Sequence, residues 1–550
     1  MRKIALLLVL MLLAVHVVAA QESTPAATTA VADPGATPFA CPTTGGTMVT
    51  QGNGDPESLN GLYANDGNSL AVTTFMDEPL VLGGENWGDQ TQPALAQSWD
   101  VSPDGLTYTF HLRQGVKWSD GQPFTSADVI FTFDAVLEDD NTIDWKTNLM
   151  QGDKPIGYKA IDDNTVQVTL SAPDPAILNQ MSIPIVPKHG FASTHIKDAP
   201  FNSAPITTGP FKFVKWETGQ DVQLEANKDY WGGAPCLDRI VVRFISGAQN
   251  VANALQSGDV DFAEVDGADL SVFDNNADYV VAKEPRDLVR LIGFNTKSKT
   301  VGDPAVRRAL ITGLDRQAII DAAVGGNGTI SDSLFNQSAS SYQAGLNTQY
   351  PFDPDQAKQM LADAGWKDSD GNGFLDKDGQ ELTLKLEYSA SWALMGLIAP
   401  IVYDNWKALG VNITLDAVDD ATGNTDIYDN TSTDKPYDAF LSGWGLFGTD
   451  PSHYQDFYAN DTSYLAYDNP DVTKLFDAGN TETDPAKRTA IYQQADKLLW
   501  QDLPMIPIFQ PIGVYAYTSN LNLDAAEING TFLTGLKYPA RAYFVNPPQS

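Results

Sequence analysis

The sequence is short of basic residues: 34 Lys and Arg stand against 70 Asp and Glu, which gives a net charge of −36. The acidic residues are spread along the chain and form no single block, so they indicate a solvated surface and not an interaction tail. A field of this sign disfavours nucleic acid and anionic membrane surfaces as partners. A second interpretation, that the field attracts cationic solutes, also fits the charge.

Catalytic signatures are missing as well. There is no Gly-x-Ser-x-Gly elbow, no phosphate loop and no catalytic Cys–His signature. Asp and Glu are so abundant that no general-acid pair stands out. Beyond residue 20 only four histidines occur, and none has a partner at metal-ligand spacing: His111, His189, His195 and His453. We therefore expect that the protein is not an enzyme.

Long apolar runs are absent after the first twenty residues. A basic pair at residues 2–3 precedes an apolar stretch over residues 4–18, and small residues follow. This order predicts a secretory signal over residues 1–20, cleaved after Ala20, because the run is shorter than the ~20 residues of a membrane span. An uncleaved membrane anchor is the alternative. Residues 21–40, rich in Ala, Thr and Pro, predict a disordered tether, so we expect an exported protein, periplasmic or extracellular, associated with the cell envelope.

What the chain does have is a dense local pattern over residues 93–133. Apolar and polar side chains alternate over residues 106–113, which is the period of a half-buried strand. Turn sequences stand on either side, Pro-Asp-Gly before the alternation and Ser-Asp-Gly after it. Thr125 with Asp128 three residues later resembles a capping box, and apolar residues follow at helical spacing. The stretch therefore predicts a hairpin, a turn and a helix.

Three passages together resemble one known family. The stretch 93–133 keeps nearly every position of a pattern that runs from PALA and SW through TYTF and GVKW to DV. Residues 208–240, with TGPF, YWGG and LDRI, and residues 254–261, ALQSGDVD, continue the match. The chain resembles the extracellular solute-binding proteins of family 5, which are the dipeptide, oligopeptide and nickel receptors of ABC importers. The resemblance covers about residues 45–519.

The resemblance implies an α/β fold with two lobes, like periplasmic binding proteins of type II, cluster C, with an extra domain inserted in the first lobe. A length of 550 residues also favours more than one domain. The implied division is a first-lobe core of residues 41–70, 202–292 and 508–550, an inserted domain over 71–201 and a second lobe over 293–507. A chain that leaves the first lobe and returns makes two crossings, which predict a hinge.

Only two cysteines are present, Cys41 and Cys236. Because export favours oxidation, a disulfide is the first hypothesis, and two buried free thiols are the alternative. Each cysteine shortly precedes a strand-like run. The family resemblance implies that these two strands are neighbours in one sheet, which would place both sulfurs at the same end of it.

The resemblance also indicates where specificity is decided. In the family's peptide receptors a Gly-Trp pair is followed, three residues after the Trp, by an Asp that holds the ammonium group of the peptide. Here Trp444 follows Gly443, and Phe447 stands at the position of that Asp. A phenyl ring offers a cation only a weaker cation–π contact, so a peptide ligand is less well supported than in those receptors.

We expect the ligand-binding residues around this motif. Asp450 is a candidate for a shifted carboxylate, although starting an Asp-Pro turn is its simpler role. Trp444, Trp392 and Trp87 are candidates for an apolar wall of the binding cleft. For each Trp, an ordinary core position is the alternative.

An acidic loop at residues 368–376 has the spacing of a calcium loop. The oxygen ligands at positions 1, 3, 5, 7 and 9 would be Asp368, Asp370, Asn372, the Phe374 carbonyl and Asp376. Position 12, where a bidentate Glu belongs, is Gly379. A structural Ca²⁺ and a plain acidic turn are both open interpretations, and no cofactor is required by either.

Together these features predict an exported receptor that closes around a small solute, with a peptide or peptide-like solute first and an oligosaccharide as the alternative. An exported calcium-dependent hydrolase is the alternative of a different class. The expected partners are the solute and the transmembrane subunits of an ABC permease. We expect a monomer that binds no nucleic acid.

Overall fold

The computed structural model describes residues 38–83, 91–267, 269–335, 337, 339–428, 435–445, 450–459, 464–528 and 535–548. By its contacts the chain from Val31 to Ser550 forms one unit. None of the helices in the described ranges combines the length and the apolar character needed to cross a membrane.

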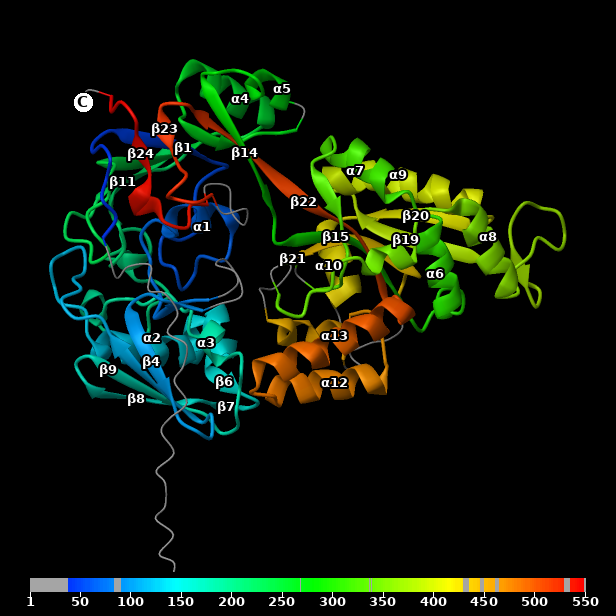
Figure 1. Ribbon diagram of the computed structural model, residues 1–550, viewed down its shortest axis with the longest axis horizontal. Helices are drawn as coiled ribbons and strands as arrows, with labels where there is room; N and C mark the ends of the chain where they lie inside the picture. Colours follow the sequence, from blue (N-terminus) through cyan, green and yellow to red (C-terminus); the bar gives the residue numbers. More distant parts are fainter. Residues whose placement is uncertain are drawn as a thin grey trace, which may run out of the picture. The chain divides into compact units, whose positions relative to one another are not determined.

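A twelve-stranded sheet organises the chain (Figure 1). Along its main path the hydrogen-bonded order is β10, β11, β12, β1, β13, β22, β15, β21, β19 and β20, while β14 and β16 also pair with β22. Strands β1, β12 and β13 are parallel to one another, and so are β19, β20 and β21. The bounds are β1 Thr47–Gly52, β10 Phe211–Glu217, β11 Asp221–Ala226, β12 Arg239–Phe244, β13 Phe262–Glu264, β14 Tyr279–Pro285, β15 Leu288–Phe294, β16 Gly328–Ile330, β19 Thr383–Ser389, β20 Asn412–Val418, β21 Ala439–Gly445 and β22 Met505–Thr518.

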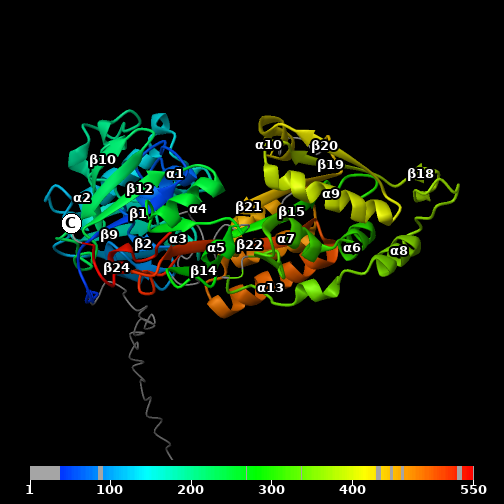
Figure 2. The same cartoon turned by 90° about the horizontal axis from the view of Figure 1, so that it is seen from above.

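Strand β22 belongs to both halves of this sheet, because β14 pairs with its residues 512–518 and β15 pairs with its residues 505–509. Figure 2 shows β22 and β14 continuing from one half toward the other. Two short segments therefore connect the halves, residues 285–288 between β14 and β15, and residues 509–512 within β22. Only a few backbone torsions in these segments need to change for one half to move against the other.

The half that begins with β1 has its own apolar core, in which Met48, Phe262 and Tyr515 pack together. Cys41 and Cys236 form a disulfide with Cα atoms 5.4 Å apart, which confirms the predicted bond. The register of β1 against β12, with Thr47 opposite Arg239, places both sulfurs at the same end of the sheet. Helices α4 Ala248–Ser257 and α5 Leu270–Phe273 follow strands of this half.

A separate four-stranded sheet, β4-β5-β9-β8, contains the first part of the stretch 93–133 in its strands β4 and β5. In β5 the residues alternate between half-buried and buried, as predicted. Helix α2 starts with the predicted capping box: Thr125 accepts from the backbone of the first turn, and the Asp128 carboxylate accepts from the Thr125 backbone N–H. The bounds of these elements are β4 Ala96–Val101, β5 Thr107–Leu112, β8 Gly157–Asp162, β9 Thr165–Thr169 and α2 Ser126–Leu137.

The half that contains β19 to β21 is covered by helices whose apolar faces meet in the largest core of the described residues, around Phe294, Trp406 and Trp500. Here the bounds are α6 Pro304–Thr312, α7 Arg316–Val324, α8 Pro354–Asp363, α9 Ala393–Ala408, α10 Asp420–Tyr428, α11 Gln455–Tyr458, α12 Pro470–Thr481 and α13 Pro485–Asp502. The shorter elements elsewhere are α1 Gly67–Thr73, α3 Ile177–Gln180, β2 Val81–Leu82, β3 Gln92–Pro93, β6 Met150–Gln151, β7 Lys154–Pro155, β17 Asp376–Lys377, β18 Gln380–Glu381, β23 Leu521–Asn522 and β24 Tyr543–Phe544.

Candidate functional site

A groove of about 520 Å³ lies where the two halves of the twelve-stranded sheet join, and we call it the hinge groove. Its first wall is built at the carboxyl ends of parallel strands: residues 51 and 53 at the end of β1, 247–251 after β12 and 264–267 at the end of β13. In open α/β sheets, ligands bind in the crevice outside the carboxyl ends of the strands, where the connections diverge.

The second wall of the hinge groove comes from the other half of the sheet. It consists of Leu288 and Arg290 on β15, Leu394 on α9, and residues 323–327 at the end of α7. The connecting segments themselves, with Arg286 and Pro511, form the floor between the walls. A solute in this groove would touch both halves and the hinge at once.

Arg286 and Glu264 form an ion pair across the groove floor, and their side chains are 20% and 22% exposed. The Arg286 carbonyl accepts a hydrogen bond from the Gln510 side chain at 2.7 Å, which fixes the connecting segment against β22. The pair neutralises both charges, so neither is the obvious partner for a charged solute.

Arg290 differs from Arg286, because its side chain makes no hydrogen bond and no ion pair with any residue that the structure describes, and its Nε is buried without a partner. Its guanidinium carbon lies 4.8 Å from the centre of the Trp392 ring. On another side lies Gly443, where a Cβ would overlap the guanidinium. Burial, followed by repulsion from Arg286, lowers the pKa of Arg290 to about 10.

A second cavity, of about 580 Å³, lies between the β4–β5 turn and helices α12 and α13, and we call it the Arg488 cavity. In it Arg488 donates to both oxygens of Asp450, at 2.9 and 2.7 Å, and lies over the Tyr492 ring at 5.1 Å. Burial alone would raise the pKa of Asp450, but the hydrogen bond and charge of Arg488 lower it. The Arg488 guanidinium in this cavity is therefore already paired with a carboxylate, that of Asp450.

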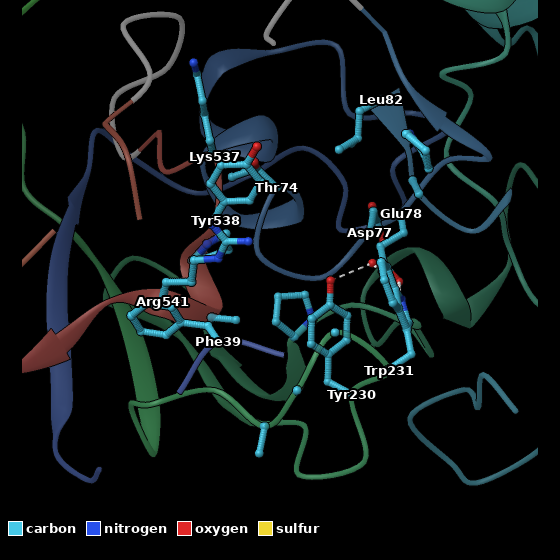
Figure 3. Close-up of a pocket in the computed structure, with 18 residues that line it drawn as sticks. Phe39, Thr74, Asp77, Glu78, Leu82, Tyr230, Trp231, Lys537, Tyr538 and Arg541 are labelled. Atoms are coloured by element: carbon cyan, nitrogen blue, oxygen red, sulfur yellow. Dashed lines mark hydrogen bonds between the residues drawn. The ribbon is translucent and has the colours of Figure 1, made fainter. Parts of the chain in front are cut away.

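A smaller pocket, of about 110 Å³, lies within the half that contains β1 (Figure 3). Its buried Glu78 accepts from the Tyr230 hydroxyl at 2.9 Å and from the Trp231 indole at 3.0 Å. Burial raises the pKa of the neighbouring Asp77 to about 8, and the charge of Glu78 acts in the same direction. Because this pocket touches neither connecting segment, we do not assign the solute to it.

The residues that the sequence singled out lie in different places. Trp392 is 38% exposed and stands against Arg290, beside the hinge groove. Trp444 is 5% exposed and packs on Phe457 with ring centres 4.4 Å apart, inside the core of its own half. Asp450 lies in the Arg488 cavity and starts the turn at Pro451, accepting from the Ser452 N–H at 2.9 Å. Trp87 and Phe447 lie outside the described residues.

In the acidic loop predicted to bind calcium, the carboxylates are engaged by the backbone of the loop itself. Asp368 accepts from the N–H of Gly371 and of Gly373, and Asp376 accepts from the N–H and hydroxyl of Ser369. Across the described part of the chain, no three acidic, histidine or cysteine side chains are grouped as metal ligands would be. The contacts of Asp370, Asn372 and Phe374 likewise stay within the loop, apart from one from Asn372 to Glu381, so the calcium site gains no support.

Sequence reasoning missed the charged residues of the hinge groove. Arg290 is the one charged residue in the otherwise apolar run Leu-Val-Arg-Leu-Ile-Gly-Phe of β15. A charge inside such a strand is costly unless it has a partner or a function, so this break in the pattern was the available signal. Glu264 and Arg286 gave no comparable signal, since Glu264 is the last residue of β13 and Arg286 lies between β14 and β15.

The fold and the groove define a class: two-lobed α/β binding proteins that hold a solute at the junction of their lobes. The family model of the bacterial extracellular solute-binding proteins, family 5, middle region, matches residues 90–465. The chain belongs to this family and is a solute-binding receptor, and its predicted fold class is confirmed.

Several known proteins are similar to the chain over most of its length. The oligopeptide-binding protein AppA of Bacillus subtilis is 28% identical over 539 residues, 94% of this chain and 96% of AppA. A putative ABC transporter peptide-binding protein of Brucella ovis is 31% identical over 81% of this chain and 83% of its own length. The crystal structure of the ABC transporter substrate-binding protein CtaP from Listeria monocytogenes matches with a TM-score of 0.82 and 28% identity, over 92% of this chain and all of CtaP. AppA of Bacillus subtilis in complex with a nonapeptide matches with a TM-score of 0.71 and 26% identity, over 92% of this chain and all of that one.

Proposed function

We propose that the chain captures a short peptide or peptide-like solute in the hinge groove and delivers it to the transmembrane subunits of an ABC importer. The observation that carries this proposal is the position of the groove: it joins the carboxyl ends of β1 and β13 to β15 and α9, across the two connecting segments. A solute bound there gains contacts to both walls only when they come together, so binding favours the closed state.

A peptide fits the chemistry of the groove, since a zwitterion needs anchors of both signs. The groove contains Asp266 on one wall and Arg290 on the other, with the Arg286–Glu264 ion pair between them. Similar proteins point the same way: AppA of Bacillus subtilis is an oligopeptide-binding protein, and its solved complex holds a nonapeptide. Wall residues such as Leu288, Leu394 and Val514 supply the apolar surface for side chains.

The proposed division of the chain follows the predicted one. The first lobe comprises residues 41–70, 202–292 and 508–550, the inserted domain residues 71–201, and the second lobe residues 293–507. The hinge is made by the two connecting segments. We further propose that the protein is exported, stays associated with the cell envelope and acts as a monomer.

A stability screen tests the function most economically. The purified chain is melted with short peptides, with oligosaccharides and with calcium, nickel and other metal ions. A solute present at ~100 times its dissociation constant should raise the free energy of unfolding by about 2.7 kcal/mol. We expect peptides to raise the melting temperature and to be recovered intact by mass spectrometry. Stabilisation by oligosaccharides alone, or turnover of the added peptide, would contradict the proposal.

A further inference from the structure

Arg290 is the one cation of the hinge groove that has no hydrogen-bond or ion-pair partner among the described residues. Of the charges facing it, Arg286 repels it, and Glu264 is bonded to Arg286. A half-buried cation without a carboxylate has lost part of its hydration without gaining a counter-charge, and such groups concentrate at binding sites.

The packing around Arg290 holds the guanidinium in place without neutralising it. Trp392 lies against it from the segment between β19 and α9. Gly443 lies directly opposite Arg290 in the β15–β21 register and leaves the space that the guanidinium occupies. A stacked planar guanidinium keeps its edge donors available, which is the geometry that binds a carboxylate with two parallel hydrogen bonds.

We propose that Arg290 is the anion anchor of the hinge groove, and that the solute carries a carboxylate which this guanidinium binds. The inference rests on the proposed function for the location of the solute. A carboxylate is favoured over a phosphate because one guanidinium offers one positive charge, while Asp266 lines the same groove and repels a second negative charge.

The experiment compares probes with and without a carboxylate, by calorimetry and thermal melting on the full chain. The probes are trialanine and its C-terminal amide, galacturonate and galactose, citrate, and inorganic phosphate. Arg290→Gln removes the anchor, and Arg308→Gln is the matched control, because Arg308 is an arginine whose guanidinium donates to the Gln501 carbonyl at 2.7 Å, away from the groove.

We expect a carboxylate probe to bind the wild type roughly 10- to 100-fold more tightly than its neutral twin. Arg290→Gln should remove this preference, and Arg308→Gln should keep it. If trialanine and its amide bind equally well, or the preference survives in Arg290→Gln, the anion anchor is wrong while the peptide function stands. If galacturonate or citrate binds through Arg290 and no peptide does, the peptide function is wrong and the anchor stands. Binding of phosphate in preference to every carboxylate, or of no anionic probe at all, would overturn the inference.

Discussion

Arg488 and Arg290 lie in two cavities of the same molecule, each against an aromatic ring, but only Arg488 has an acidic partner among the described residues. Arg488 has two hydrogen bonds to Asp450, and although burial alone would lower its pKa, Asp450 raises it. Arg290 has Trp392 and no acid among the described residues, and its pKa falls to about 10. The comparison indicates that the first arginine holds the structure together, whereas the second is available for a solute.

The largest effect on stability should come from breaking the buried ion pair between Arg488 and Asp450. Asp450→Ala leaves Arg488 without its partner in a site where the two side chains are 15% and 6% exposed, so the free energy of unfolding should fall by about 3–5 kcal/mol. The measurement is denaturant unfolding at neutral pH. Asp471→Ala removes one partner of the exposed Lys474 pair and should change stability by less than ~1 kcal/mol. Equal effects of the two variants would show that burial does not distinguish them.

The buried carboxyl group of Asp496 should make the stability of the protein depend on pH. Burial raises the pKa of Asp496 to about 7, although Ser333 and the Leu334 N–H donate to it. The stability that belongs to this group is fully present below its unfolded pKa and is lost as pH rises toward 7, at up to about 1.4 kcal/mol per pH unit. The free energy of unfolding, measured at pH 5, 6 and 7, should therefore decline as the pH rises, and it should decline less in Asp496→Asn. Asp355→Asn, on the exposed face of α8, is the control and should leave the slope unchanged.

Gly443 tests whether the position of Arg290 matters. A Cβ in Gly443→Ala would overlap the guanidinium, so the Arg290 side chain must move at a cost of about 1–3 kcal/mol. Quenching of tryptophan fluorescence by added carboxylate probes should weaken in this variant, since Arg290 no longer lies over Trp392. Gly396→Ala on α9, where a Cβ would meet nothing within 4 Å, is the matched control. Loss of quenching in both variants would point to a general effect on folding.

The smallest effect on stability should come from Arg290 itself. Removing an uncompensated cation in Arg290→Gln takes away a repulsion by Arg286 and loses one stacking contact, so the free energy of unfolding should change by less than ~1 kcal/mol. Denaturant unfolding without ligand measures it. A loss as large as that of Asp450→Ala would mean that Arg290 has a structural role, and the distinction between the two arginines would fail.

The sequence predicted local structure and family well, because both depend on neighbours in the chain. The alternation in β5, the capping box of α2 and the disulfide between Cys41 and Cys236 are confirmed by the structure. The grouping around Arg290 was not predicted, because Arg290, Gly443 and Trp392 come from three separate segments and meet only through the pairing of β15 with β21 and the position of α9. Asp450 was singled out by its spacing from Trp444, but its partner Arg488 is 38 residues further on, where no local pattern connects them.

Hydrogen exchange of the backbone, with and without a bound peptide, tests the account most directly, because it reports where the solute lies. The hinge groove predicts slower exchange on binding at residues 264–267, 286–290, 392–394 and 510–514. Residues 102–105 and 481–489 of the Arg488 cavity should respond less, through closure alone. Protection confined to the Arg488 cavity or to the pocket around Glu78, with residues 286–290 unchanged, would contradict the assignment of the solute to the hinge.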